Sequence, residues 1–130
     1  MPLPIHSKSL SILVADDDMV MQRLIVTLLK HAGHTGVVVN NGKEALACLA
    51  QRQFDVLLLD IMMPEMDGLE LLAAIRSEEK KSNRHQKIIM LTGHAEPTDA
   101  SRLKQAGADG YVIKPINAKQ LFDELLRVNT

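Results

Sequence analysis

Short apolar runs rich in β-branched residues alternate along this chain with segments in which apolar residues recur at helical spacing. The runs are continuous rather than alternating between polar and apolar residues, which is the pattern of strands covered on both faces of a sheet. They lie at residues 12–15, 37–39, 56–59, 88–91 and 111–113. The pattern therefore predicts five buried strands.

The segments between the runs carry helical stripes and residues that start or end helices. Val20 and Leu24 open the first stripe, and Gly33 follows it where a helix end favours a left-handed residue. Pro97 suits the first turn of the fourth helix. The five predicted helices are centred on the stripes at 20–31, 45–49, 71–75, 100–106 and 118–126.

The predicted order is a strand followed by a helix, repeated five times. This order is typical of an α/β domain with a parallel sheet, right-handed crossovers and helices on both faces. A closed eight-stranded barrel needs a longer chain, so we expect an open sheet. In open sheets of this class, ligands bind beyond the carboxyl ends of the strands, where the strand order reverses.

Composition excludes several classes of protein. With 130 residues and 46% apolar content, the chain can bury roughly two thirds of its unfolded surface as one domain. The net charge of −1 provides no basic field, so we expect no direct binding of nucleic acid. A single cysteine, Cys48, fits a reducing compartment, and no apolar run is long enough to span a membrane. We therefore expect a cytoplasmic domain at residues 10–128, with 1–9 as a flexible leader or linker.

Polar and ionisable residues follow the strand runs at the predicted carboxyl edge of the sheet. They are Asp16, Asp17 and Asp18 after the first run, Asp60 after the third, Thr92 after the fourth and Lys114 after the fifth. If the first and third strands are neighbours, several carboxylates converge, which requires a shared proton or a bound cation. Because all the donors are hard oxygen atoms, magnesium fits best, with manganese as the alternative.

This set of residues favours phosphoryl chemistry. A cation and Lys114 would neutralise a phosphoryl group, and Asp60 could serve as the nucleophile that forms an aspartyl phosphate. Each group alone has a plainer explanation, since an acidic triplet often caps a helix, Thr92 could merely end a strand and Lys114 could belong to a turn. Their coincidence at one edge of the sheet favours a functional site.

The chain resembles the receiver domain of bacterial two-component response regulators, the CheY-like domains, across residues 10–128. The resemblance rests on the segments ILVADDD, NNGKEAL, DVLLLDIMMPEMDGLELL, IIMLTGHA and AGADGYVIKPI. It implies a flavodoxin-like (βα)5 fold with strand order 2-1-3-4-5, the order of the chemotaxis member of this family. It also implies a phosphoacceptor of a phosphorelay, whose partner is a histidine kinase or a histidine phosphotransfer protein.

The resemblance implies a role for each residue at the strand ends. Asp60 would accept the phosphoryl group in a magnesium-dependent reaction, and Lys114 would pair with the phosphoryl oxygens. Asp16 and Asp17 match the acidic pair, which would hold the metal together with Asp60 and the backbone carbonyl of Met62.

The resemblance further implies a switch. Thr92 would hydrogen-bond the phosphoryl group, and the backbone of Gly93 would face it. The ring of Tyr111 would turn inward and change the surface of the fourth helix, fifth strand and fifth helix, through which a homodimer could form. The peptide bond before Pro115 is often cis in this family.

Other interpretations remain open at this stage. A phosphatase of the haloacid-dehalogenase type also uses a strand-end aspartate, but it generally carries a second aspartate where this chain has Met62. A receiver that acts only as a scaffold usually lacks a site residue, and this chain has all of them. We therefore expect no conventional enzyme, whether the chain is a stand-alone regulator or part of a longer response regulator or hybrid histidine kinase.

Three further features have an ordinary and a functional interpretation. The charge-dense stretch 77–87 after the third helix reads as a solvated helix end and loop, with a docking surface as the alternative. His31 and His34 have the spacing of a metal pair, although a histidine at a helix end more often interacts with the helix dipole. His94 occupies the family position that tunes autodephosphorylation.

Overall fold

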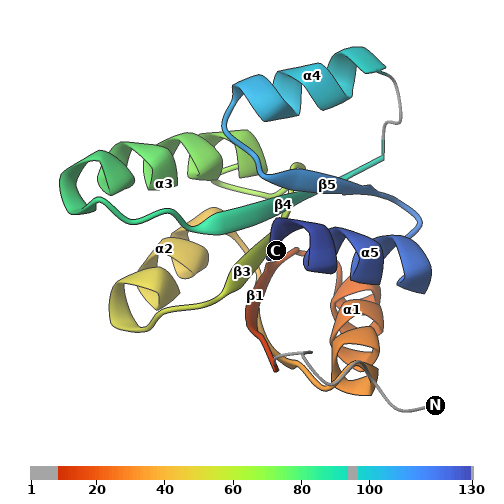
Figure 1. Ribbon diagram of the computed structural model, residues 1–130. Coiled ribbons are helices and arrows are strands. Elements are labelled where there is room, and N and C mark those ends of the chain that lie inside the picture. Colours follow the sequence, from red (N-terminus) through yellow and green to blue (C-terminus); the bar gives the residue numbers. More distant parts are fainter. Residues whose placement is uncertain (1–8, 94–96, 130) are drawn as a thin grey trace.

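The computed structural model describes residues 9–93 and 97–129 of the chain. Strands and helices alternate as predicted (Figure 1): β1 Ser11–Ala15, α1 Met19–His31, β2 Thr35–Val39, α2 Gly42–Gln51, β3 Val56–Asp60, α3 Gly68–Ser82, β4 Lys87–Thr92, α4 Pro97–Gln105, β5 Gly110–Ile113 and α5 Ala118–Val128. All strand pairs are parallel, in the order β2-β1-β3-β4-β5. The flavodoxin-like (βα)5 fold is thus confirmed, with the strand order reversing between β1 and β3.

Helices cover both faces of the sheet, as Figure 1 shows. Leu13 and Leu57 point to the face packed by α2, α3 and α4, whereas Ile12 and Val56 point to the face packed by α1 and α5. Successive side chains of a strand alternate between faces, so continuous apolar runs are needed when both faces are buried. This explains why the strands carry no polar–apolar alternation.

Polar side chains at the carboxyl edge start four of the helices. Asp18, Asn41, Asp67 and Asn117 are the N-cap residues of α1, α2, α3 and α5, and each accepts a hydrogen bond from a backbone N–H of the first turn. A cap of this kind satisfies a donor that the helix leaves unpaired. The cap role proposed for the acidic triplet is therefore correct for Asp18.

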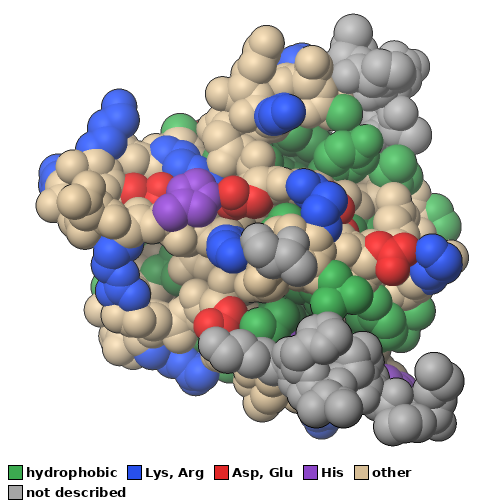
Figure 2. Space-filling view, in the orientation of Figure 1, with side chains coloured by type: hydrophobic (Ala, Val, Ile, Leu, Met, Phe, Trp, Pro, Cys, Tyr) green, Lys and Arg blue, Asp and Glu red, His purple; other side chains and the backbone are tan. Residues whose placement is uncertain are grey.

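The charge-dense stretch is the solvated helix end and loop that the sequence predicts, since α3 continues to Ser82 before Asn83 ends it in the left-handed conformation. Arg76 binds Glu79 at 2.8 Å and Asp109 at 3.0 Å, and the Nε2 atom of His85 lies 2.7 Å from Asp109. Figure 2 shows acidic side chains on either side of a histidine on the face in view. This network ties the end of α3 to the starts of β4 and β5, at the edge opposite the predicted site.

Within the described residues, no helix is both long and apolar enough to cross a membrane. Of the predicted leader 1–9, residues 1–8 lie outside the described residues, and so does His94. The boundaries 10–128 remain a prediction.

Candidate functional site

Three aspartates converge at the carboxyl edge of the sheet, where β1 and β3 lie side by side. Carboxylate oxygens of Asp16, Asp17 and Asp60 all lie within 4.8 Å of one another. Asp16 is 0% exposed and Asp60 is 5% exposed, whereas Asp17 is open to solvent. The predicted neighbourhood of the first and third strands thus brings the carboxylates together.

Lys114 reaches this cluster from the end of β5. Its Nζ atom lies 3.2 Å from Asp60 Oδ2 and 3.5 Å from Asp16 Oδ2. Burial lowers the pKa of the ammonium group, but the attraction of Asp16 and Asp60 outweighs burial, so the pKa of Lys114 is raised overall. Lys114 is therefore a fixed positive charge beside the acidic cluster.

One carboxylate oxygen of Asp16 is buried without a hydrogen bond, and a bound cation would satisfy it. Its Oδ1 accepts a 2.9 Å hydrogen bond from the Asp18 amide, but its buried Oδ2 accepts no aligned hydrogen bond and has only the ammonium of Lys114 at ion-pair distance. Burial raises the pKa of the Asp16 carboxyl, and the nearby charge of Asp60 adds to the shift, against the effects of the Asp18 amide and Lys114. An oxygen-only donor set with an unsatisfied buried oxygen fits a hard divalent cation.

The loop after β3 presents Met62 beside the cluster. The Met62 amide donates a 3.4 Å hydrogen bond to Asp60 Oδ1, and the Met62 side chain is 78% exposed. The loop therefore folds back over the end of its own strand, which places the Met62 backbone next to the carboxylate. The Lys114–Pro115 peptide bond on the other side of the site is cis, as the resemblance implies.

The predicted switch residues lie on the neighbouring strands. Thr92 is the last residue of β4, is 4% exposed and pairs with Ile113 across the sheet, while Tyr111 pairs with Met90. Gly93 is exposed, and a Cβ atom placed on it would meet nothing within 4 Å. The structure thus places Thr92 at the same edge as Asp60, with open space beside Gly93.

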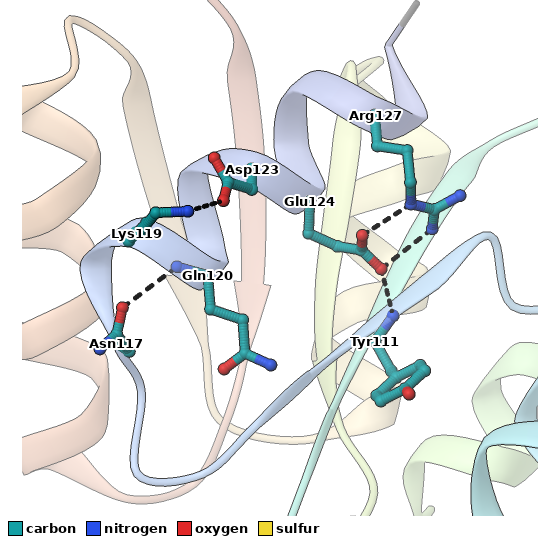
Figure 3. Close-up of a pocket in the computed structure, with 7 residues that line it drawn as sticks. All are labelled: Tyr111, Asn117, Lys119, Gln120, Asp123, Glu124 and Arg127. Carbon is teal, nitrogen blue, oxygen red and sulfur yellow. Dashed lines mark hydrogen bonds and ion pairs between the residues drawn. The ribbon is translucent and has the colours of Figure 1, made fainter. Parts of the chain in front are cut away.

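Tyr111 is half-buried beside α5. Its backbone amide donates a 2.9 Å hydrogen bond to Glu124, whose carboxylate also binds the Arg127 guanidinium at 2.7 Å. Burial raises the pKa of Glu124, but the hydrogen bonds from Arg127 and from the Tyr111 amide lower it overall. Figure 3 shows this carboxylate between the two donors, with the Tyr111 ring directed away from α5.

Sequence reasoning missed three residues that shape the site. Gly68 opens α3 against the backbone carbonyl of Asp60, and Gln22 and Asn40 connect two loops beside Asp16. The glycine after Asp67 was a signal for close approach, since a glycine at a helix start allows backbones to touch. Gln22 offered no signal, because a polar residue on a helix normally reads as solvated.

The two histidines considered as a metal pair have separate contacts. His31 lies in the last turn of α1, and the Nδ1 atom of His34 accepts a 3.0 Å hydrogen bond from the Leu10 amide. Burial lowers the pKa of His34, with the charge of Asp55 opposing the shift. Within the part of the chain that the structure describes, the aspartates above are the one group of three or more potential metal ligands.

Comparison with known proteins decides the family. The response regulator receiver domain model matches residues 12–126. The chain belongs to this family. It is a CheY-like receiver domain with a phosphoacceptor role in two-component signalling. Receiver domains bind Mg²⁺ at an acidic pocket, and they interact with histidine kinases or phosphotransfer proteins.

Similar proteins include large histidine kinases and small chemotaxis proteins. The chain is 38% identical over 117 residues to hybrid signal transduction histidine kinase I of Dictyostelium discoideum, and 36% identical over 125 residues to the sensor protein GacS of Pseudomonas syringae pv. syringae. These matches cover 86% and 95% of this chain but only 7% and 14% of the two relatives. The chemotaxis protein CheY of Pseudomonas aeruginosa is 35% identical, over 92% of this chain and 95% of that protein.

Solved structures of a chemotaxis regulator and of a kinase receiver domain have the same fold as this chain. Chemotaxis response regulator CheY4 of Vibrio cholerae superposes with a TM-score of 0.83 at 32% identity, over 93% of this chain and 99% of that one. The signal receiver domain of a signal transduction histidine kinase from Syntrophus aciditrophicus gives a TM-score of 0.78 at 28% identity, over 90% of this chain and 87% of that one. The chain thus matches both free-standing response regulators and receiver segments of kinases.

Proposed function

We propose that Asp60 is the residue that accepts the phosphoryl group, with Lys114 and a divalent cation neutralising the charge. The observation that carries this proposal is the position of the Lys114 ammonium, 3.2 Å from Asp60 Oδ2, beside three converging carboxylates. A phosphoryl group on Asp60 would bring its negative charge to the place where the positive charges already lie. Charge stabilisation and positioning are most of what phosphoryl transfer requires.

The acceptor step is a direct displacement. An Asp60 carboxylate oxygen attacks the phosphorus of a donor phosphohistidine, a P–O bond forms as the P–N bond breaks, and the electron pair of the broken bond returns to the imidazole. Lys114 then pairs with a phosphoryl oxygen, and the Met62 amide remains near the phosphorylated carboxyl group of Asp60. Asp16, Asp17, Asp60 and the Met62 carbonyl would hold Mg²⁺, or Mn²⁺ in its place, which supplies further charge neutralisation when bound.

The switch operates through Thr92 and Tyr111. A phosphoryl group at Asp60 would attract the Thr92 hydroxyl into a charge-assisted hydrogen bond, and the Gly93 amide would face the same oxygens. Movement of Thr92 leaves space on the face where the half-buried Tyr111 ring packs, so the ring can turn inward. The surface of α4, β5 and α5 would then change, and a second copy of the chain could bind there.

The phosphodonor is a histidine kinase or a histidine phosphotransfer protein. It must approach Asp60 over the carboxyl edge of the sheet, where large apolar side chains are exposed: Met19 at 64%, Val20 at 76% and Met62 at 78%. Exposed apolar groups around an acidic opening support docking of a protein surface, because a small phosphodonor needs no such contact.

The decisive experiment is the Asp60→Asn substitution. We expect acetyl phosphate with Mg²⁺ to label the wild-type protein, and Asp60→Asn to lose the label, as read by intact-protein mass spectrometry. Asp123→Asn, which alters an exposed aspartate of α5, is the matched control and should label normally. Undiminished labelling of Asp60→Asn would overturn the proposal, and sustained hydrolysis of a generic phosphoester would indicate a phosphatase instead.

A further inference from the structure

The loop that carries the acidic pair is tied to the loop after β2 by one glutamine. The Gln22 side chain, on α1, donates a 2.5 Å hydrogen bond from Nε2 to the backbone carbonyl of Asp16. The same nitrogen donates a 2.8 Å hydrogen bond to Asn40 Oδ1. A side-chain amide nitrogen has two hydrogens, so Gln22 can satisfy both acceptors at once.

Glu44 completes a series of hydrogen bonds in which the donor and acceptor roles of Gln22 and Asn40 are fixed. Glu44 Oε1 accepts from the Asn40 backbone amide at 2.8 Å and from Asn40 Nδ2 at 3.3 Å. Because the Asn40 nitrogen faces a carboxylate, its oxygen must face Gln22, and Gln22 must therefore act as the donor. Glu44 itself is held in the first turn of α2, where its amide donates to the Asn41 cap.

These hydrogen bonds fix the peptide group between Asp16 and Asp17. The Asp16 amide donates to Val39 at 3.2 Å, and the Asp16 carbonyl accepts from Gln22, so both polar backbone atoms of Asp16 are bonded. The Asp16 carbonyl lies in one rigid plane with the Asp17 nitrogen. Among the described residues no hydrogen bond holds the Asp17 carboxylate itself, so its direction depends on this backbone.

We propose that Gln22, braced by Asn40 and Glu44, is a positioning residue that orients the Asp16–Asp17 peptide so that the Asp17 carboxylate joins those of Asp16 and Asp60 around a divalent cation. Gln22 does not touch the cation. The inference rests on the metal-dependent acceptor site proposed above and extends it to residues of α1 and of the loop after β2.

The test is the affinity of the full chain for Mn²⁺, measured from the electron paramagnetic resonance signal of the free ion. Gln22→Met keeps an unbranched side chain of similar length but donates no hydrogen bond. We expect its dissociation constant for Mn²⁺ to rise about tenfold, the loss typical when a group that orients a metal ligand is removed. Asn40→Ala leaves Gln22 in place but removes its hydrogen-bond partner, so it should give a smaller rise in the dissociation constant. This variant tests the hydrogen-bonded series without altering α1.

Gln86→Met is the matched control. The Gln86 side chain also donates to backbone carbonyls, those of Phe54 and Lys87 at 3.2 Å, but it does so at the opposite edge of the sheet. Thermal melting in EDTA should therefore show a similar loss of stability in Gln22→Met and Gln86→Met, whereas the Mn²⁺ affinity should fall only in Gln22→Met. An affinity of Gln22→Met equal to that of Gln86→Met would overturn the inference alone. Failure of the wild-type chain to bind Mn²⁺ would overturn the proposed metal site and this inference together.

Discussion

The Asp16 carboxylate combines complete burial with an oxygen that accepts no aligned hydrogen bond. A buried ionised oxygen in this state lowers the stability of the metal-free fold, since it has lost its water without an adequate replacement. Such a residue persists when it serves a bound cation, because binding sites commonly trade stability for function. The unsatisfied oxygen of Asp16 is thus an argument for the metal site.

Asp16→Asn should stabilise the metal-free protein at neutral pH. The amide keeps an acceptor for the Asp18 amide and removes the buried charge. Burial raises the pKa of Asp16 in the folded state above its unfolded value of 3.8, so its destabilising effect is present above the folded pKa and fades as the pH falls through it. Urea unfolding in EDTA should give a higher free energy for the variant at pH 7, with a smaller difference at pH 4. A variant less stable than wild type at pH 7 would contradict this account.

At the scale of elements, the start of α3 lies directly against the end of β3. A Cβ atom on Gly68 would collide with the Asp60 carbonyl oxygen and would lie 2.8 Å from Ile61 Cα. The Gly68 amide also donates to the Ile61 carbonyl at 2.8 Å. The absence of a side chain therefore lets the helix and the acceptor strand share one tight turn.

Gly68→Ala should separate α3 from β3 and disturb the acceptor. We expect a loss of about 2 kcal/mol in the free energy of unfolding, the usual size of an overpacking effect, together with slower labelling by acetyl phosphate. Gly93→Ala is the stability control, since its Cβ would meet nothing within 4 Å, and it should change the free energy by less than about 0.5 kcal/mol. Chemical denaturation measures the free energy of unfolding of both variants. A Gly68→Ala variant as stable as Gly93→Ala would exclude the close contact between α3 and β3.

At the scale of the whole molecule, the two edges of the sheet have different chemistry. The carboxyl edge holds the acidic cluster and the exposed Met19, Val20 and Met62, whereas at the amino edge the network around Arg76 holds the starts of β4 and β5. A protein donor that reaches Asp60 must therefore contact these apolar side chains before the phosphoryl group is transferred.

Val20→Ser should separate donor docking from chemistry. We expect the rate of labelling by a phosphorylated histidine-containing protein to fall about tenfold, because a large apolar contact in an interface is worth about 1–2 kcal/mol. Labelling by acetyl phosphate should stay within twofold of wild type, since that donor needs no docking surface. Leu126→Ser changes an apolar residue of α5 that is 52% exposed and should affect neither rate. Equal losses with both donors would show that Val20 acts on the site itself.

Much of the site was predictable because parallel strands point the same way. Once Asp16, Asp60 and Lys114 each follow a buried strand, the βα repeat alone brings them to one edge of the sheet. Local periodicity does not reveal which strands are neighbours, so the order 2-1-3-4-5 came from the resemblance to receivers and is confirmed by the strand pairing. Periodicity did not locate the end of α3, because the apolar stripe stops before the charged residues that continue the helix to Ser82.

The amino-acid sequence by itself determined the strands, the helices and the kinds of group that meet at the carboxyl edge, since these depend on local pattern and on strand direction. The tertiary structure decided the distances that make the group a site: the 3.2 Å contact of Lys114 with Asp60 and the unsatisfied oxygen of Asp16. It also decided the partnership of Gln22 with Asn40. Pairing of Ala15 with Val39 places Asp16 and Asn40 on adjacent strand ends within reach of Gln22, and a register is a property of two strands that neither strand carries alone.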